Sequence, residues 1–274
     1  MSEPSRRKPI ERHMDPYHRR GESAEREDEG IIEGRNAVIE ALRAGRAIDK
    51  IYIAKGETDA ALGHIASKAR AAGAVVVDAD RRKLDQMSVT HAHQGVIALA
   101  AVREYVSVAD ILACAEERGE PPMIIVCDEI SDPHNLGAII RTAEASGAHG
   151  VVIPKRRSAG LTAIVEKTSA GAVEHVNVAR VANLTAAIKE LKKAGVWVFG
   201  AAAGGPTRLW DADLKGPCAI VIGSEGEGMS RLVEENCDFL VSIPMAGRVS
   251  SLNASVSAAI LMYEAVRQRN PGGE

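Results

Sequence analysis

The chain has 274 residues, of which 46% are hydrophobic, 26% charged and 3% aromatic. This length suits two domains, and the hydrophobic content is ordinary for a globular protein with a substantial core. A formal net charge of −3 gives no indication of a nucleic-acid partner, and so few aromatic residues disfavour a stacking platform for single-stranded RNA. Any surface that binds RNA must therefore be local.

The cysteines and the hydrophobic runs indicate a reducing compartment. The cysteines lie far apart without a C-x-x-C pair, so we expect small buried thiols rather than disulfides or a metal site: Cys114, Cys127, Cys218 and Cys237. The chain lacks a run of about 18 apolar residues, and its charged beginning lacks the apolar core of a signal peptide. We expect a soluble cytoplasmic protein that binds neither a membrane nor a metal.

The first 30 residues have few hydrophobic side chains and many charges. Residues 1–20 hold six Lys/Arg and three Asp/Glu, whereas residues 21–30 hold one Lys/Arg and five Asp/Glu. This composition cannot bury enough surface to fold, so we predict a disordered, solvated tail over residues 1–30. Contact between its basic tip and RNA is the alternative.

Residues 31–102 alternate between helical and extended patterns. Helices are expected at 34–42, 59–72 and 81–87, and strands at 50–54, 74–77 and 95–101. This alternation predicts a small αβα domain over residues 31–102. Residues 103–121 form a predicted linker that contains a helix at about 107–117 and ends in Gly119-Glu-Pro-Pro122.

A second alternation fills a predicted domain over residues 122–270. Hydrophobic runs predict six strands, at 123–127, 150–153, 176–181, 196–201, 219–222 and 239–243. Helices are expected at 136–146, 162–169, 183–194 and 252–267. Strands that alternate with helices indicate an α/β fold with a parallel sheet covered on both faces.

Two polar loops between residues 223 and 257 are the most informative part of the chain. Each follows a predicted strand, at 219–222 or 239–243, and is rich in Gly, Ser and Asn. Loops at the carboxyl ends of parallel strands bind ligands in α/β proteins, and glycine lets backbone approach a ligand closely. Two such loops, at the ends of strands that we expect to be neighbours, predict one compound site, and hence an enzyme.

An earlier polar loop, at 128–135, leads into the predicted helix that carries Arg141. Asp132-Pro133 sets a turn, and Asn135 lies six residues before Arg141, within about two helical turns. Asn135 and Arg141 can therefore reach one phosphate or ribose, and a helix cap with a surface arginine is the plainer alternative. His134 is a candidate base, although an exposed loop histidine is the default.

The two later loops also have plain structural alternatives. The segment 223–230 is neither G-x-G-x-x-G nor a P-loop, and its acidic residues disfavour a phosphate, so Glu225 suits a ribose hydroxyl, a cation or an amine. Ser251 and Asn253 stand at the start of the last predicted helix, where both are ordinary N-cap residues. The sequence shows neither metal-ligand spacing nor a G-x-S-x-G elbow.

Taken together, the three loops resemble the SpoU (TrmH-like, SPOUT) family of RNA 2′-O-ribose methyltransferases. The matching segments are Asp132-Pro-His-Asn-Leu-Gly-Ala-Ile-Ile-Arg-Thr-Ala143, Ile222-Gly-Ser-Glu-Gly-Glu-Gly-Met229, Ser242-Ile-Pro-Met-Ala-Gly247 and Ser251-Leu-Asn-Ala-Ser255. Three further segments look most like the RlmB branch, which methylates a guanosine ribose in the peptidyl-tRNA-binding loop of 23S rRNA: Ile32-Glu-Gly-Arg-Asn-Ala-Val38, His93-Gln-Gly-Val96 and Pro154-Lys-Arg-Arg-Ser-Ala159. Gly160 departs from the proline frequent in relatives and is expected to loosen its loop.

The resemblance implies a C-terminal α/β domain with a deep trefoil knot, a ribosomal-protein-L30e-like N-terminal domain that grips RNA, and a homodimer. It implies S-adenosylmethionine as the cofactor, bound near Gly223, Gly228, Ile243, Met245 and Leu252. It further implies that Arg141 is catalytic and that four residues orient the ribose and the arginine: Asn135, Glu225, Ser251 and Asn253. The implied partner is 23S rRNA or a precursor of the large ribosomal subunit.

Other functions stay open. Within the family, the alternatives are a tRNA ribose methylase, which generally lacks the N-terminal module, and a thiostrepton-resistance rRNA methylase. A non-catalytic rRNA-binding assembly factor on the same fold would have a degraded cofactor site. A dinucleotide enzyme is disfavoured, because the G-x-G-x-x-G motif and an acidic residue about 20 positions beyond it are both missing.

Overall fold

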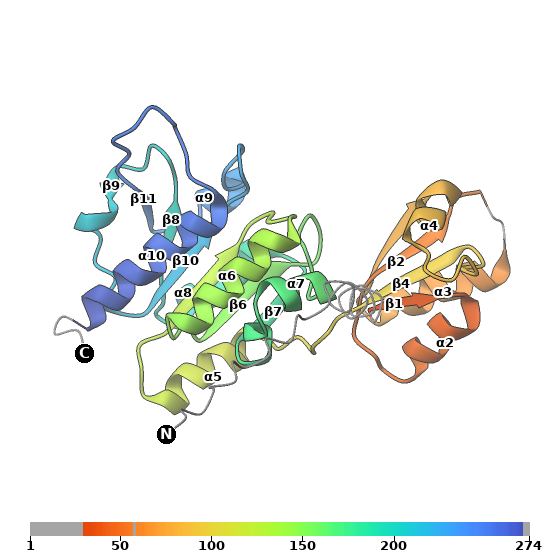
Figure 1. The fold of residues 1–274 in the computed structure, drawn as a ribbon. Helices are drawn as coiled ribbons and strands as arrows, with labels where there is room; N and C mark the ends of the chain where they lie inside the picture. The colour runs from red at the N-terminus through yellow and green to blue at the C-terminus, as the bar shows by residue number, and fades with distance from the viewer. Residues whose placement is uncertain (1–29, 57–58, 271–274) are drawn as a thin grey trace, which may run out of the picture.

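The computed structural model describes residues 30–56 and 59–270, which form two α/β units that follow one another along the chain (Figure 1). Apart from Gly30, the tail predicted over residues 1–30 lies outside the described residues. Within these ranges, no helix is long and apolar enough to cross a membrane.

The first unit is built on a mixed four-stranded sheet of order β1-β4-β2-β3. Its strands are β1 (Ile31–Glu33), β2 (Ile48–Ala54), β3 (Val75–Ala79) and β4 (Val96–Ala100). β4 runs antiparallel to β1 and β2, whereas β2 and β3 are parallel. Sequence patterning misses β1, because three residues are too few to show an alternation.

Helices cover both faces of this first sheet. They are α2 (Arg35–Arg43), α3 (Ala60–Ala71) and α4 (Arg81–Met87). Val38 of α2 and Ile65 of α3 are fully buried in one cluster with Ala98 of β4. Leu84 of α4 is buried in a second cluster with Ile97. Because consecutive residues of a strand point to opposite faces, the two clusters lie on opposite sides of the sheet, which confirms the predicted αβα arrangement.

The second unit is built on a seven-stranded sheet in which every pairing is parallel. In sheet order the strands are β7 (Asn177–Val181), β6 (Gly150–Pro154), β5 (Met123–Cys127), β10 (Cys218–Ile222), β8 (Trp197–Ala201), β11 (Phe239–Ser242) and β9 (Thr207–Arg208). The six predicted strands are present, and the short edge strand β9 is the addition. All residues of β5 and β10 are buried, as expected for central strands of a parallel sheet.

Two layers of helices cover this second sheet, as predicted (Figure 1). One layer contains α6 (Pro133–Ala145), α7 (Ala163–Thr168) and α10 (Ala254–Arg269), and the other contains α5 (Val108–Arg118), α8 (Leu184–Lys193) and α9 (Arg231–Glu234). Two 3₁₀ turns, at Ala172–Glu174 and Leu209–Asp211, complete the unit. Because Val108 and Ile111 of α5 are buried against the second sheet, part of the predicted linker packs with the second unit.

The strand order corrects one expectation about the two late loops. The strands that precede them, β10 and β11, are not neighbours, because β8 lies between them. Local periodicity cannot give strand order, and only the parallel direction guarantees that both loops leave from the same edge of the sheet. The trefoil knot that the resemblance implies stays a prediction.

A buried ion pair joins the two units. Arg180 of β7 donates from Nη1 to Asp49 Oδ1 of β2 at 2.7 Å, and the side chains are 6% and 2% exposed. The hydroxyl of Tyr105 also donates to Asp49 Oδ1, at 2.5 Å. Burial raises the pKa of the Asp49 carboxyl, and Arg180 opposes this rise.

Gly160 packs directly on this joint. A Cβ built at Gly160 would lie 2.1 Å from Asp49 Oδ2, closer than any real contact. The predicted loosening of the loop is therefore wrong: Gly160 is buried and close-packed, and the glycine makes room for the Asp49 carboxylate.

Candidate active site

Asn135 lies in the first turn of α6, at the carboxyl edge of the second sheet. Asp132 is the N-cap residue and accepts a hydrogen bond from the backbone N of His134 at 2.9 Å, and Pro133 follows as the first helical residue. The helix therefore begins three residues earlier than predicted, and Asp132 rather than Asn135 caps it. The Asn135 side chain is left for contacts with other loops.

Glu225 joins the three polar loops through one carboxylate oxygen. Asn135 donates from Nδ2 to Glu225 Oε1 at 3.0 Å, and Asn253 Nδ2 donates to the same oxygen. The backbone N of Ala254 lies 3.3 Å from it, and Asn253 Nδ2 also donates to Asn135 Oδ1 at 3.0 Å. The structure thus brings together three residues that the sequence singled out.

Asn253 has two roles at once. Its Oδ1 caps α10 by accepting from the backbone N of Ser255 at 2.9 Å and of Val256 at 3.3 Å. Its Nδ2 makes the contacts with Asn135 and Glu225. The plain capping alternative is therefore correct for Asn253, and it does not exclude a role in the site.

The glycine loop is a tight turn held against the end of β5. Ser224 and Gly228 exchange backbone hydrogen bonds at 2.9 and 3.0 Å, and Gly228 has a φ of 73°. A Cβ at Gly223 would lie 2.1 Å from the carbonyl carbon of Gly228, so only glycine fits. Asp128, which is buried, accepts from the backbone N of Ser230 at 2.6 Å. Sequence reasoning passed over Asp128, although its place at the end of a buried strand was a usable signal.

Arg141 and Ser251 are exposed and lie apart from this network. Arg141 lies six residues after Asn135 on α6, and its guanidinium has no hydrogen-bond or ion-pair partner among the described residues. Ser251 lies in the irregular segment before α10, and its hydroxyl likewise has no partner in the described part of the chain. Both side chains are accessible to a ligand, and Arg141 is a cation available to a phosphate.

The segment from Met245 to Leu252 leaves its backbone open. None of its backbone groups makes a hydrogen bond with another described residue. Ile243, two residues before the segment, is half-buried against the core, Leu252 is half-buried, and Met245 is 38% exposed. A ligand recognised mainly through backbone N–H and C=O groups needs such unpaired groups.

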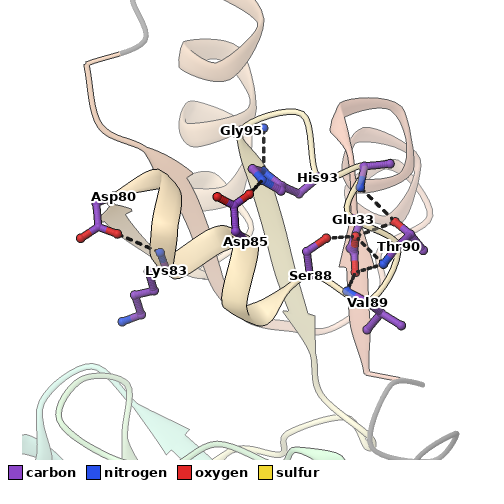
Figure 2. Close-up of polar contacts among 10 residues, drawn as sticks. Glu33, Asp80, Lys83, Asp85, Ser88, Val89, Thr90, His93 and Gly95 are labelled. Atoms are coloured by element: carbon purple, nitrogen blue, oxygen red, sulfur yellow. Dashed lines mark hydrogen bonds and ion pairs between the residues drawn. The ribbon is translucent and has the colours of Figure 1, made fainter.

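The first unit fixes a loop of its own beside β4 (Figure 2). Glu33 accepts from the hydroxyls of Ser88 at 2.6 Å and of Thr90 at 2.7 Å, and from the backbone N of Val89. His93 is buried, with Nε2 at 3.0 Å from Asp85 Oδ1. Its Nδ1 accepts from the backbone N of Gly95 at 3.1 Å. His93 is therefore a structural residue that shapes this loop.

Each of the two units matches a known protein family. Residues 122–263 match the SpoU rRNA methylase family, and residues 31–106 match the RNA 2′-O ribose methyltransferase substrate-binding domain. The chain is 50% identical to YacO of Bacillus subtilis, a protein named as a TrmH family tRNA/rRNA methyltransferase. The match extends over 241 residues, which are 88% of this chain and 96% of YacO.

Two solved structures match across both units, and a third matches a smaller part of the chain. The SpoU methyltransferase AviRb from Streptomyces viridochromogenes, in complex with AdoMet, gives a TM-score of 0.57 at 25% identity, over 88% of this chain and 91% of that chain. An AdoMet-bound rRNA methyltransferase from Sinorhizobium meliloti gives 0.55 at 26% identity, over 86% of each chain. The A. aeolicus TrmH/SpoU tRNA modifying enzyme gives 0.51 at 27% identity, but spans only 61% of this chain and 86% of its own.

Fold, site and comparisons together define a tRNA/rRNA 2′-O-ribose methyltransferase with a substrate-binding domain. The chain belongs to the SpoU rRNA methylase family. Its cofactor is S-adenosylmethionine, which solved relatives hold as AdoMet. The open backbone between Met245 and Leu252 fits a cofactor held through main-chain groups.

Proposed function

We propose that the protein methylates the 2′-oxygen of one guanosine in the peptidyl-tRNA-binding loop of 23S rRNA, in the rRNA itself or in a precursor of the large subunit. The observation that carries the proposal is the Asn135–Glu225–Asn253 network on a chain that also has the substrate-binding domain. The rRNA methyltransferase from Sinorhizobium meliloti spans both domains, whereas the tRNA modifying enzyme matches a smaller part.

The cofactor is expected to lie between the two late loops. Gly223 and Gly228 would form one wall, and Ile243, Met245 and Leu252 would form the other through their backbone. The cofactor supplies an activated methyl group on sulfur. The chain's own contribution is to hold the ribose in line with that methyl group, and such alignment is worth roughly 7–11 kcal/mol in well-oriented reactions.

Arg141 is proposed to act on the RNA rather than as a proton acceptor. Guanidinium groups keep their protons in proteins, so a literal general-base role is disfavoured. An exposed guanidinium without a partner among the described residues can clamp the phosphate beside the target ribose. The same positive charge stabilises the alkoxide that develops on the 2′-oxygen while the hydroxyl proton passes to solvent water.

Glu225, Asn135 and Asn253 are proposed to orient this arrangement, together with Ser251. The carboxylate of Glu225 holds the starts of α6 and α10 at fixed positions relative to the glycine loop. Asn135 thereby places α6, and with it Arg141, against the cofactor loops. The Ser251 hydroxyl, which is exposed, is free to bond the ribose or the arginine.

A homodimer through α10 is also proposed. Val256 and Tyr263 of α10 are 45% and 50% exposed. They lie seven residues apart and therefore share one face of the helix. A second copy of this face would cover both side chains, and Val256 lies in the first turn of α10, close to Asn253 and so to the site.

Calorimetry on the purified chain tests the enzyme class. We expect one S-adenosylmethionine bound per chain, whereas a non-catalytic assembly factor with a degraded site would bind rRNA without the cofactor. A tRNA or thiostrepton-resistance type enzyme would bind the cofactor equally well, and only the methylated RNA separates these alternatives.

A further inference from the structure

The basic loop Lys155–Arg157 lies beside the loop that leads into α6. It follows β6 at the carboxyl edge of the sheet. The backbone N of Ala159 donates to the carbonyl oxygen of Ile130 at 2.8 Å, and the hydroxyl of Ser158 donates to the same oxygen at 3.2 Å. The two residues that follow the basic loop are thus hydrogen-bonded to Ile130, which lies shortly before α6.

The same loop is tied to the first unit. The carbonyl oxygen of Lys155 lies 3.4 Å from Arg180 Nη2, and Arg180 is the residue that pairs with Asp49. A Cβ built at Gly73, in the turn between α3 and β3, would lie 3.1 Å from Lys155 Nζ. The Lys155 ammonium therefore lies over the substrate-binding domain, and the loop lies at the junction of the two units.

Arg157 combines a rare backbone conformation with an acidic partner. Arg157 and Glu129 both have left-handed backbone, with φ of 57° and 58°, which non-glycine residues adopt rarely. Arg157 Nη1 lies 2.8 Å from Glu129 Oε1, and the Arg157 side chain is 79% exposed. Strained residues of this kind gather at functional sites.

Arg156 carries the same positive charge as Arg157 but has neither a left-handed backbone nor an acidic partner among the described residues. Its side chain is exposed, and it has no hydrogen-bond or ion-pair partner among the described residues. The loop therefore presents one unpaired guanidinium, one pre-oriented guanidinium and one ammonium on a chain whose net charge is −3. Such a local concentration of cations is the kind of surface that a low overall charge requires for RNA binding.

We propose that the loop Lys155–Arg157 binds the RNA backbone between the substrate-binding domain and the active site, with Arg156 as its main phosphate contact. Phosphate contacts position an RNA without reading its sequence, so the loop would set the path of the strand rather than choose the nucleotide. Arg157 would add a second contact, weakened by the carboxylate of Glu129. The proposal rests on the proposed function, which supplies the RNA.

The test measures binding of a 23S rRNA transcript to the full chain as a function of KCl concentration. Arg156→Gln is expected to weaken binding about threefold to tenfold. It should also reduce the slope of log K against log [KCl] by about 0.7–0.9, the value for one lost phosphate contact. Lys189→Gln, an exposed position on α8 with the same change in charge, is the matched control and should leave both quantities unchanged.

Glu129→Gln is expected to change RNA binding in the opposite direction to Arg156→Gln. Removing the carboxylate beside Arg157 should strengthen binding several-fold, whereas a purely structural ion pair would weaken it or leave it unchanged. The proposal is overturned if Arg156→Gln matches Lys189→Gln in affinity and slope. S-adenosylmethionine binding should stay unchanged in all three variants, which shows that they are folded.

Methyl transfer separates this proposal from the proposed function. If the wild-type chain methylates 23S rRNA while Arg156→Gln binds RNA normally, the loop proposal fails and the function stands. If Arg156 governs RNA binding but the wild-type chain transfers no methyl group, the proposed function fails and the loop proposal stands. A turnover number that falls with KM unchanged in Arg156→Gln would also contradict a role in RNA binding.

Discussion

The Glu225 carboxylate accepts a hydrogen bond from the Nδ2 of Asn135 at 3.0 Å, across 90 residues of sequence. The same oxygen accepts from Asn253 Nδ2 and from the backbone N of Ala254. One carboxylate thus holds the starts of two helices, α6 and α10, against the glycine loop.

Replacement of Glu225 by Gln tests this arrangement. A neutral amide replaces an ionised acceptor of several N–H groups, and hydrogen bonds to a charged group are about twice as strong as neutral ones. We expect kcat to fall about tenfold or more, with a small change in melting temperature. Glu227→Gln is the control in the same loop, since Glu227 is exposed and has no partner among the described residues. An equal fall in both variants would remove the special role of Glu225.

Arg141→Lys is expected to lower kcat about 10²-fold, because a lysine lacks the planar fork that binds a phosphate bidentately, and its shorter reach moves the charge away from the developing alkoxide. Steady-state kinetics with S-adenosylmethionine and rRNA measure the effect. The wild-type pH–rate profile should show no base-type rise below about pH 9. Loss of RNA affinity in Arg141→Ala with single-turnover chemistry left intact would count against alkoxide stabilisation.

We expect His149 to make folding stability depend on pH. Burial lowers the pKa of His149, and the Arg118 charge lowers it further. In the unfolded chain a histidine has a pKa of about 6.5. As the pH falls below that value, the unfolded state binds a proton that the folded state does not yet accept, so the free energy of unfolding decreases. Urea unfolding at pH 8 and pH 5.5 should show a smaller loss in His149→Gln than in the wild type, and an equal loss would refute the assignment.

Gly160→Ala is expected to destabilise the fold. The added Cβ would meet the Asp49 carboxylate at 2.1 Å, and that carboxylate is fixed by Arg180 and Tyr105. Overpacking of this kind costs about 1–3 kcal/mol. Gly204→Ala is the control, since a Cβ there meets nothing within 4 Å. Denaturant unfolding compares the two variants, and equal free energies of unfolding would mean that Asp49 moves away from residue 160 at little cost.

Tyr263→Glu tests the proposed dimer. A charge on the exposed face of α10 should convert a dimer to a monomer in sedimentation equilibrium, because burying an unpaired carboxylate is unfavourable. Lys193→Glu on α8 serves as the control. A wild-type chain that is already monomeric at micromolar concentration would contradict the dimer.

Part of the Asn135–Glu225–Asn253 network can be anticipated from the sequence. Strands that end in polar loops indicate one edge of a parallel sheet, which groups Glu225 with Asn253, and the family resemblance adds Asn135 to them. The helix cap could not be predicted in the same way. Asp132 caps α6 because the first turn begins at Pro133, and the sequence pattern places that turn three residues later. The network itself needs exact side-chain positions.

The features that sequence patterns miss depend on contacts between distant segments. Nothing local distinguishes Asp49, a polar residue in a strand, from an exposed one, and only its partner Arg180 explains its burial. The position of the Asp49 carboxylate also explains why residue 160 is a glycine. The position of β8 between β10 and β11 is likewise a property of the whole sheet.

Ribose-methylation mapping of rRNA and tRNA most directly tests the account. RNA from cells that lack the gene is incubated with the purified chain and S-adenosylmethionine, and the same incubation without S-adenosylmethionine is the blank. The account predicts one new 2′-O-methyl group, on a guanosine in the peptidyl-tRNA-binding loop of 23S rRNA. A new methyl group on tRNA alone would contradict the proposed substrate, and no methyl transfer by a chain that binds S-adenosylmethionine would contradict the proposed reaction.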